Sequence, residues 1–126
     1  MLSNRRAMAT IPAADIGRAK AWYSEKLGLV PEMSDDTGLL YRLGGGSGFL
    51  LYPTPNAGQA PNTLMTFESS DVAADVAALK GKGVMFEEYD LPELKTVNSI
   101  ASLGGRKAAW FKDSEGNILA VGDGPS

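Results

Sequence analysis

The same sequence pattern occurs twice in this chain, and this repeat constrains the fold more than any other feature. In each half, a strand-like run precedes a helix-like segment that starts at an aspartate and stops at a glycine, and three further strand-like runs follow. Asp15 and Asp71 lie 56 positions apart, and Gly28 and Gly83 lie 55 positions apart. Repetition at a fixed period indicates duplication of one supersecondary unit. We therefore predict an α+β fold in which residues 1–126 form a single domain of two βαβββ modules.

The first module is predicted to span residues 7–54. "RAMATIP" is typical of a short strand that stops at Pro12, and Asp15 suits the N-cap of the helix that follows. The apolar face of this helix recurs at helical spacing in Ile16, Ala19, Tyr23 and Leu27. "GLLYRLGGGSGFLLYP" then predicts a hairpin around a glycine-rich turn. Residues 44–48 match neither the dinucleotide fingerprint nor the phosphate-binding loop, so we interpret them as a turn only.

The second module is predicted to span residues 63–122, after a linker rich in Pro, Gly and Asn at residues 55–62. "NTLMTFES" is typical of a strand, a helix follows Asp71, and "VMFEEY" predicts the next strand, before a loop at residues 90–99. "AAWFKDSEGNILAV" predicts the last hairpin, because Asp, Asn and Gly favour tight turns. The stretch "DLPELKTVNSIAS" has no counterpart in the first half, and insertions of this kind often border a ligand site.

The residue types that are absent exclude several kinds of chemistry. The chain has no cysteine and no histidine, so it lacks a thiolate nucleophile, the ligands of common zinc sites and the most common general base. Its net charge of −3 argues against binding to nucleic acid or to an anionic membrane, since both need a basic face. No apolar run is long enough to cross a membrane, and the start of the chain lacks the apolar core of a secretory signal. We therefore expect a cytoplasmic protein.

Three segments together resemble a known superfamily. "IPAADIGRAKAWYSEKLGLVP", "LMTFESSDVAADVAALKGKGV" and "AAWFKDSEGNILAV" are similar to the vicinal-oxygen-chelate superfamily, which contains glyoxalases, bleomycin-resistance proteins and extradiol dioxygenases. The similarity extends over roughly residues 7–122. It implies that the two βαβββ modules form an open U-shaped sheet around a pocket, and that the protein is a homodimer.

The resemblance also implies where a metal would bind. Metal-dependent members carry a ligand on the first and the last strand of each module. These positions fall on Met8, Leu64, Ala120 and one residue of the run from Phe49 to Leu51. All of these side chains are apolar, and none can hold a hard divalent cation. We therefore expect a metal-independent protein without a cofactor.

Further pocket residues follow from the alternation of side chains between the two faces of a strand. The predicted ligand pocket consists of Met8, Thr10, Tyr41, Tyr52, Leu64, Thr66, Ala108, Trp110, Lys112 and Ala120. Trp110 would form one wall and could stack on a planar ligand, although a core aromatic is the alternative. The two tyrosines could donate phenol hydrogen bonds or simply pack. Glu68, at the rim, is either a catalytic base or an ordinary surface carboxylate.

Three functions remain open from the sequence. The first is sequestration of a planar or cationic small molecule, which needs only a shaped apolar pocket. The second is a metal-free lyase or isomerase acting on a small carbonyl or aromatic metabolite, with Glu68 as its base. The third is an interaction module without a ligand of its own. The acidic cluster of Glu87, Glu88 and Asp90 either favours a cationic ligand or marks a solvated strand end.

Overall fold

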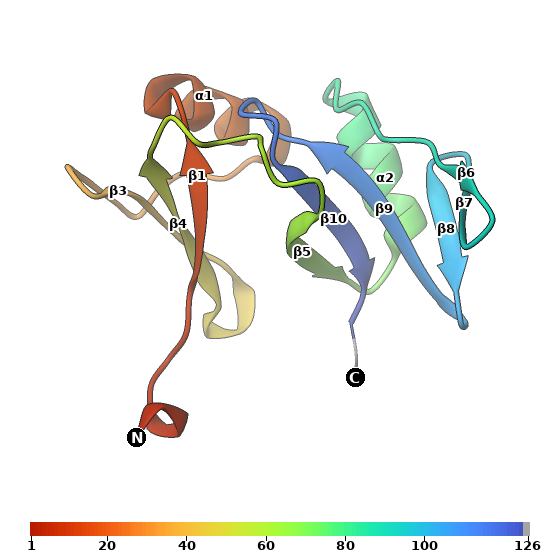
Figure 1. Ribbon diagram of the computed structural model, residues 1–126, viewed down its shortest axis with the longest axis horizontal. Helices are drawn as coiled ribbons and strands as arrows, with labels where there is room; N and C mark the ends of the chain where they lie inside the picture. The colour runs from red at the N-terminus through yellow and green to blue at the C-terminus, as the bar shows by residue number, and fades with distance from the viewer. Residues whose placement is uncertain (125–126) are drawn as a thin grey trace.

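The computed structural model describes residues 1–124, and its strands form two separate sheets (Figure 1). The first sheet has the order β1-β4-β3-β2, in which β1 and β4 are parallel and the other pairs are antiparallel. Its module consists of β1 (Ala9–Ala13), α1 (Ile16–Leu27), β2 (Met33–Asp35), β3 (Gly38–Arg42) and β4 (Gly48–Pro53). Short 3₁₀ turns lie at Leu2–Asn4 and Gly44–Gly46.

The second sheet repeats this arrangement and extends it. Its module consists of β5 (Thr63–Ser69), α2 (Val72–Gly81), β6 (Asp90–Leu91), β7 (Leu94–Val97), β8 (Ile100–Leu103), β9 (Arg106–Lys112) and β10 (Ile118–Asp123). The strand order is β5-β10-β9-β8-β7-β6, and β5 is parallel to β10 as β1 is to β4. The predicted α+β fold with two βαβββ modules is therefore confirmed, with β6 and β7 as additional strands of the second module.

Both helices begin and end where the sequence predicts, within a residue or two. Asp15 caps α1 by accepting a hydrogen bond from the Arg18 N–H at 3.0 Å, and Asp71 caps α2 through the Ala74 N–H at 3.1 Å. Gly28 ends α1 in the left-handed conformation, with φ of 68°. Within residues 1–124, neither helix is long and apolar enough to cross a membrane.

Residues 84–89 correct one prediction, because "VMFEEY" does not form a strand. Phe86 makes a single isolated bridge with Phe111, and the Glu87 N–H donates to the Trp110 carbonyl at 2.8 Å. Val84 and Phe86 pack into the apolar core, so the alternating burial of a strand is present without a continuous ladder. The strand that pairs antiparallel with the first part of β9 is β8 instead. The loop expected at residues 90–99 is also wrong, since it contains β6 and β7.

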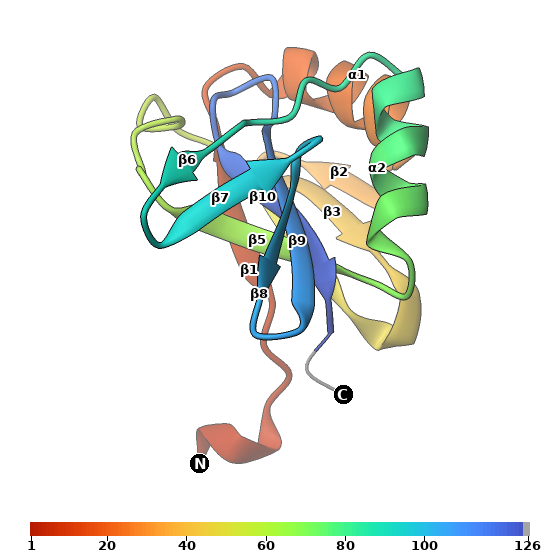
Figure 2. The same cartoon turned by 90° about the vertical axis from the view of Figure 1, so that its right-hand side faces the viewer.

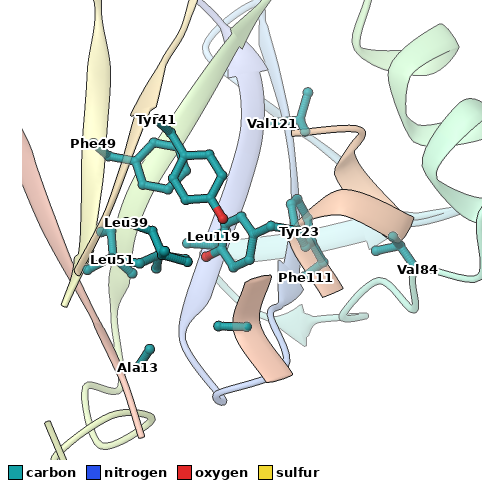
Figure 3. Packing of buried hydrophobic residues seen from close by; sticks show 12 residues of the cluster. Ala13, Tyr23, Leu39, Tyr41, Phe49, Leu51, Val84, Phe111, Leu119 and Val121 are labelled. Carbon is teal, nitrogen blue, oxygen red and sulfur yellow. The ribbon is translucent and has the colours of Figure 1, made fainter. Parts of the chain in front are cut away.

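The main core lies between the two sheets and around α1 (Figures 1 and 3). Tyr23 of α1 is fully buried, and its ring centroid lies 5.8 Å from that of Tyr41 and also 5.8 Å from that of Phe49. From the second sheet, Phe111, Leu119 and Val121 complete this cluster. A smaller cluster of Val72, Val76 and Ala109 lies where α2 covers the second sheet. The sheets thus turn one face toward the core and the other face outward.

The β9–β10 turn ties the second module to the first. Its polar side chains Asp113, Glu115 and Asn117 are all buried. Asp113 accepts a hydrogen bond from the Tyr23 hydroxyl at 2.6 Å, Glu115 forms an ion pair with Arg18 at 2.8 Å, and Asn117 Nδ2 donates to the Pro12 carbonyl at 2.7 Å. The sequence predicts the turn from its residue types, but these bonds to the other module become visible only in the structure.

Candidate functional site

The strand registers place most of the predicted site residues of the second module on its outer face. Residues directly opposite each other in paired strands share a face. Ala120 of β10 lies opposite Trp110 of β9 and Thr66 of β5, whereas its neighbours Leu119 and Val121 point into the core. The same face carries the opposed pairs Lys112–Ile118, Ala108–Gly122 and Glu68–Gly122. The predicted alternation along these strands agrees with this register.

The first sheet has a corresponding outer face. Thr10 lies opposite Leu50, and Tyr52 lies opposite Pro12, while Ile11 and Leu51 point into the core. Leu50 is thus the outward residue of the run from Phe49 to Leu51. It occupies the position that Ala120 has in the second module, because each lies opposite the threonine five residues before the capping aspartate. Met8, just before β1, is 47% exposed.

Two of the predicted pocket residues lie elsewhere. Tyr41 is opposite Phe49 on the inner face of the first sheet, and it is 1% exposed within the core. The register of β3 decides this placement, because alternation puts Leu40 outward and Tyr41 inward. Leu64 lies at a break in the register between β5 and β10 and packs against the core cluster. This irregularity changes the direction of its side chain relative to regular alternation.

An aromatic pocket lies on the outer face of the second sheet, around Trp110. Its volume is about 320 Å³, and it is lined by Pro61, Asn62, Thr63, Tyr89, Leu94, Trp110 and Ile118. The rings of Trp110 and Tyr89 meet edge to face, with centroids 5.6 Å apart and an interplanar angle of 79°. Trp110 Nε1 donates a hydrogen bond to Thr63 Oγ1 at 3.1 Å, which fixes the indole plane. We refer to this cavity as the aromatic pocket.

Tyr89 and Leu94 are pocket residues that the sequence analysis did not name. Both belong to the stretch before and within the β6–β7 hairpin, which folds over the outer face of the sheet (Figure 2). The sequence does contain a pointer to this region, because insertions without a counterpart in the other module often border a ligand site. Without the register of β7, however, the sequence does not indicate which of its side chains face Trp110.

The remaining predicted residues line other clefts. Glu68 and Thr66 border a cleft of about 490 Å³ between β5 and the turn that joins β3 to β4. Met8 lies in a shallow cleft of about 220 Å³ on the first sheet, together with Met33, Leu40 and Leu50. Within one chain, the structure therefore distributes the predicted pocket residues over several surfaces and does not bring them into one cavity.

The acidic cluster near the pocket is largely engaged by neighbouring groups. Glu87 Oε1 lies 3.5 Å from Lys112 Nζ in an ion pair at the edge of the sheet. Glu88 accepts hydrogen bonds from the hydroxyls of Thr96 and Ser99, which lower the pKa of its carboxyl below the usual value of 4.5. Both side chains add negative potential beside the aromatic pocket.

The positions implied for a metal do not fit one. Met8, Leu50, Leu64 and Ala120 offer hydrocarbon and one thioether, whereas hard divalent cations need oxygen ligands and transition metals need imidazole, thiolate or carboxylate. Among residues 1–124, no three Asp or Glu side chains gather into a possible metal site either. We assign no chemical step to a metal.

Solved structures with the same fold match almost the whole chain. A glyoxalase/bleomycin resistance protein from Catenulispora acidiphila is 25% identical, with a TM-score of 0.67 over 95% of this chain and 98% of that chain. The bleomycin resistance determinant encoded on transposon Tn5 is 18% identical, with a TM-score of 0.73 over 98% and 100% of the two chains. A bleomycin-binding protein complexed with bleomycin is 17% identical, with a TM-score of 0.72 over 96% and 99%.

No family sequence model matches the chain, and no curated protein matches it significantly in sequence. The resemblance is instead confirmed by structure, since these matches extend over both modules. The protein has the fold of the glyoxalase and bleomycin-resistance proteins of the vicinal-oxygen-chelate superfamily.

Proposed function

We propose that the protein is a metal-independent small-molecule-binding protein that sequesters a planar or cationic ligand in the aromatic pocket. The observation that carries this proposal is the edge-to-face pair of Trp110 and Tyr89 within a largely apolar cavity of about 320 Å³. Cavities of roughly 300–1,000 Å³ with apolar walls and few polar groups are typical of small-molecule sites. Sequestration requires shape and contact area only, and it needs no general base or metal.

The aromatic walls explain the expected class of ligand. A flat ring can stack on the indole face, and a cation above an aromatic face gains roughly 0.5–2 kcal/mol, depending on its desolvation. The net charge of −3 and the carboxylates of Glu87 and Glu88 increase the local concentration of cations. A neutral aliphatic ligand would gain from neither effect.

One of the solved structures with this fold is a bleomycin-binding protein in complex with bleomycin. At 17% identity it shows a common fold, and its ligand cannot be transferred residue by residue. It supports the proposal because a protein with this fold holds a small molecule.

Binding can be tested on Trp110 directly. The chain has two tryptophans, so Trp22→Phe leaves Trp110 as the only tryptophan, whose fluorescence can be excited selectively above the tyrosine band. In that background, we expect saturable quenching by members of a panel of planar aromatic cations. Calorimetry should show at least tenfold weaker binding in Trp110→Ala, equivalent to about 1.4 kcal/mol, and unchanged binding in Trp22→Phe. Failure of every compound in the panel to bind, or equal affinity for Trp110→Ala, would contradict the proposal.

The enzymatic alternative is a metal-free lyase or isomerase with Glu68 as base. Glu68 is exposed and borders the cleft next to β5 rather than the aromatic pocket. A catalytic base must reach the proton that it abstracts, so a substrate held by Trp110 in the same chain would not use this carboxylate. A turnover that is lost in Glu68→Gln would favour the alternative over sequestration.

A further inference from the structure

We infer that Glu88 is a positioning residue that holds Tyr89 and the β6–β7 hairpin against Trp110, and so selects flat ligands for the aromatic pocket. This inference rests on the proposed function. It assigns the discrimination between ligands to a segment that has no counterpart in the first module.

The inserted segment forms one wall of the aromatic pocket. Leu94 of this segment lines the pocket together with Trp110, and Tyr89, directly before the segment, meets the Trp110 ring edge to face. In the first module, the corresponding connection runs from the end of α1 at Leu27 to the start of β2 at Met33 and contains no strand, so no equivalent wall forms there. The width of the pocket is therefore set by how firmly the inserted hairpin is held.

Glu88 is the centre of the hydrogen bonds that hold it. Its Oε1 accepts from Thr96 Oγ1 at 2.6 Å and from the Ser99 N–H at 3.2 Å, and its Oε2 accepts from Ser99 Oγ at 2.8 Å. Thr96 and Ser99 are 8% and 2% exposed, so both are buried, whereas Glu88 is exposed and binds them from the surface side. One carboxylate thus joins the end of the segment before β6 to both β7 and the turn that follows it.

The turn between β7 and β8 explains why this carboxylate is needed. Asn98 and Ser99 have φ values of 52° and 75°, and no other non-glycine residue among residues 1–124 has a positive φ. Such a conformation is disfavoured in most residues with a side chain, and tight hairpins usually place glycine at the second position. Asn98 suits its position, so the disfavoured residue is Ser99, and Glu88 stabilises the turn by bonding both the N–H and the hydroxyl of Ser99.

The effect reaches Tyr89 through Thr96. The Tyr89 N–H donates to Thr96 Oγ1 at 2.8 Å, and the Thr96 N–H donates to the Tyr89 carbonyl at 2.8 Å. Tyr89 is therefore bonded on both sides of its backbone to the residue that Glu88 holds. If the turn relaxes, β7 shifts relative to β8, and the Tyr89 ring loses its edge-to-face position on Trp110.

The first experiment tests, in the absence of any ligand, whether Glu88 holds residues 89–99 in place. In amide hydrogen exchange monitored by NMR, Glu88→Ala should accelerate exchange at Tyr89, Thr96 and Ser99 at least tenfold. The control is Glu93→Gln, an exposed glutamate in the β6–β7 turn, which should leave these amides unchanged. Unchanged exchange in Glu88→Ala would overturn the positioning role, whatever the protein binds.

The second experiment measures selection by calorimetry with two cations, planar N-methylquinolinium and non-planar N,N-dimethylpiperidinium. Glu88→Ala should bind the planar probe about tenfold more weakly and the non-planar probe nearly as well as the unmodified protein. An equal loss for both probes would indicate that Glu88 acts only through its charge, which overturns the inference.

Rescue separates positioning from a general effect on the pocket. Adding Ser99→Gly to Glu88→Ala removes the strain at φ of 75° without restoring the carboxylate, so it should restore most of the affinity for the planar probe. Absence of rescue would overturn the inference.

If the unmodified protein binds neither probe nor any compound of the wider panel, the proposed function fails, and the ligand-selecting role fails with it. If binding depends on Trp110 but not on Glu88, only the inference fails.

Discussion

Tyr23 and Tyr41 are both buried, and their rings are neighbours in the core, but their hydroxyls have different surroundings (Figure 3). The Tyr23 hydroxyl donates to Asp113 at 2.6 Å, whereas the Tyr41 hydroxyl has no hydrogen-bond partner among residues 1–124. Burial raises the pKa of Tyr41 to about 12, so this hydroxyl stays neutral in the core. An unpaired buried hydroxyl costs roughly 1–3 kcal/mol, while a paired one stabilises the fold.

These two tyrosines should therefore respond in opposite directions to the same substitution. Tyr23→Phe should lower the free energy of unfolding by about 1–3 kcal/mol, because Asp113 loses a buried donor. Tyr41→Phe should leave it unchanged or raise it by about 1 kcal/mol. Urea denaturation followed by circular dichroism measures both. A Tyr41→Phe variant as unstable as Tyr23→Phe would show that the Tyr41 hydroxyl has a partner in solution.

Glu115 should make stability depend on pH in a defined window. Burial opposes its ionisation, but hydrogen bonds from Arg18, the Asp15 N–H and Ser114 outweigh burial and lower its pKa from 4.5 to about 2. The folded pKa lies below the unfolded value, so the stabilisation is complete above about pH 4.5 and is lost as the pH falls toward 2.

Glu115→Gln should therefore lower the free energy of unfolding at pH 7 by about 2–3 kcal/mol, with the lower value allowing for solvent screening of the half-exposed Arg18. The loss should shrink as the pH falls through the same window. Chemical denaturation at pH 7 and pH 3 measures this, with the exposed Glu25→Gln as control. An equal loss at both pH values would exclude the ionised carboxylate as the cause.

At the scale of elements, the linker packs on the β9–β10 turn where Gly58 meets Gly116, since a β-carbon on Gly116 would lie 3.2 Å from the Gly58 Cα. Gly58 has φ of 76°, and a β-carbon on it would lie 2.5 Å from the Glu115 carbonyl oxygen. The Gly58 N–H also donates to Asn117 Oδ1 at 3.2 Å. The linker is thus fixed in place by the turn.

Gly58→Ala should consequently lower the thermal unfolding temperature, at a cost of roughly 2 kcal/mol or more from the left-handed backbone and the close contact. Gly44→Ala is the matched control, because a β-carbon there meets nothing within 4 Å. It should change the free energy of unfolding by less than about 0.5 kcal/mol. Equal effects of the two substitutions would show that the linker does not pack on the turn as described.

The segment at residues 84–89 shows what an alternating pattern can predict at this scale. Val84 and Phe86 are turned toward the core while Met85 is 86% exposed, as in a strand. Alternation reports which side chains are buried, but a strand also needs a neighbour along its length. Only one bridge to β9 forms, so the pattern predicts the burial correctly and the element wrongly.

At the scale of the whole molecule, several large apolar side chains are exposed together on the outer face of the first sheet. Met8, Met33 and Tyr52 are 47%, 56% and 37% exposed, and Leu40 and Leu50 lie between them. Contiguous exposed apolar surface commonly marks an association site. We propose that a second copy of the chain covers this face, in agreement with the homodimer expected from the sequence resemblance.

Met33→Glu should weaken this association, because it would bury an unpaired charge in the interface. Sedimentation velocity over a range of concentrations should show a dimer for the unmodified protein and at least a tenfold higher dissociation constant for Met33→Glu. Met85→Glu, which is exposed on another part of the surface, should have no effect. A monomer at all concentrations would exclude the proposed homodimer.

The candidate site could be predicted only in part from the sequence. Trp110 and its neighbours on β9 and β10 were identified correctly as one face, because alternation along a regular strand needs no tertiary information. Tyr41 and Leu64 were placed on the wrong face, since each depends on a register or an irregularity set by strand pairing. The sequence does not predict Tyr89 and Leu94 as pocket residues, because their place beside Trp110 depends on hydrogen bonds and strand pairing between residues 88 and 99.

The sequence by itself determined the two modules and the helix ends, because repeats and caps are local properties. Only the tertiary structure decided two further features. The first is the set of buried bonds from Asp113, Glu115 and Asn117 to the first module, and the second is the wall of the aromatic pocket opposite Trp110. Both join residues far apart in the chain, and their geometry depends on strand register and on turns with positive φ. Such pairings are chosen by the packing of the whole molecule, so no local pattern could have specified them.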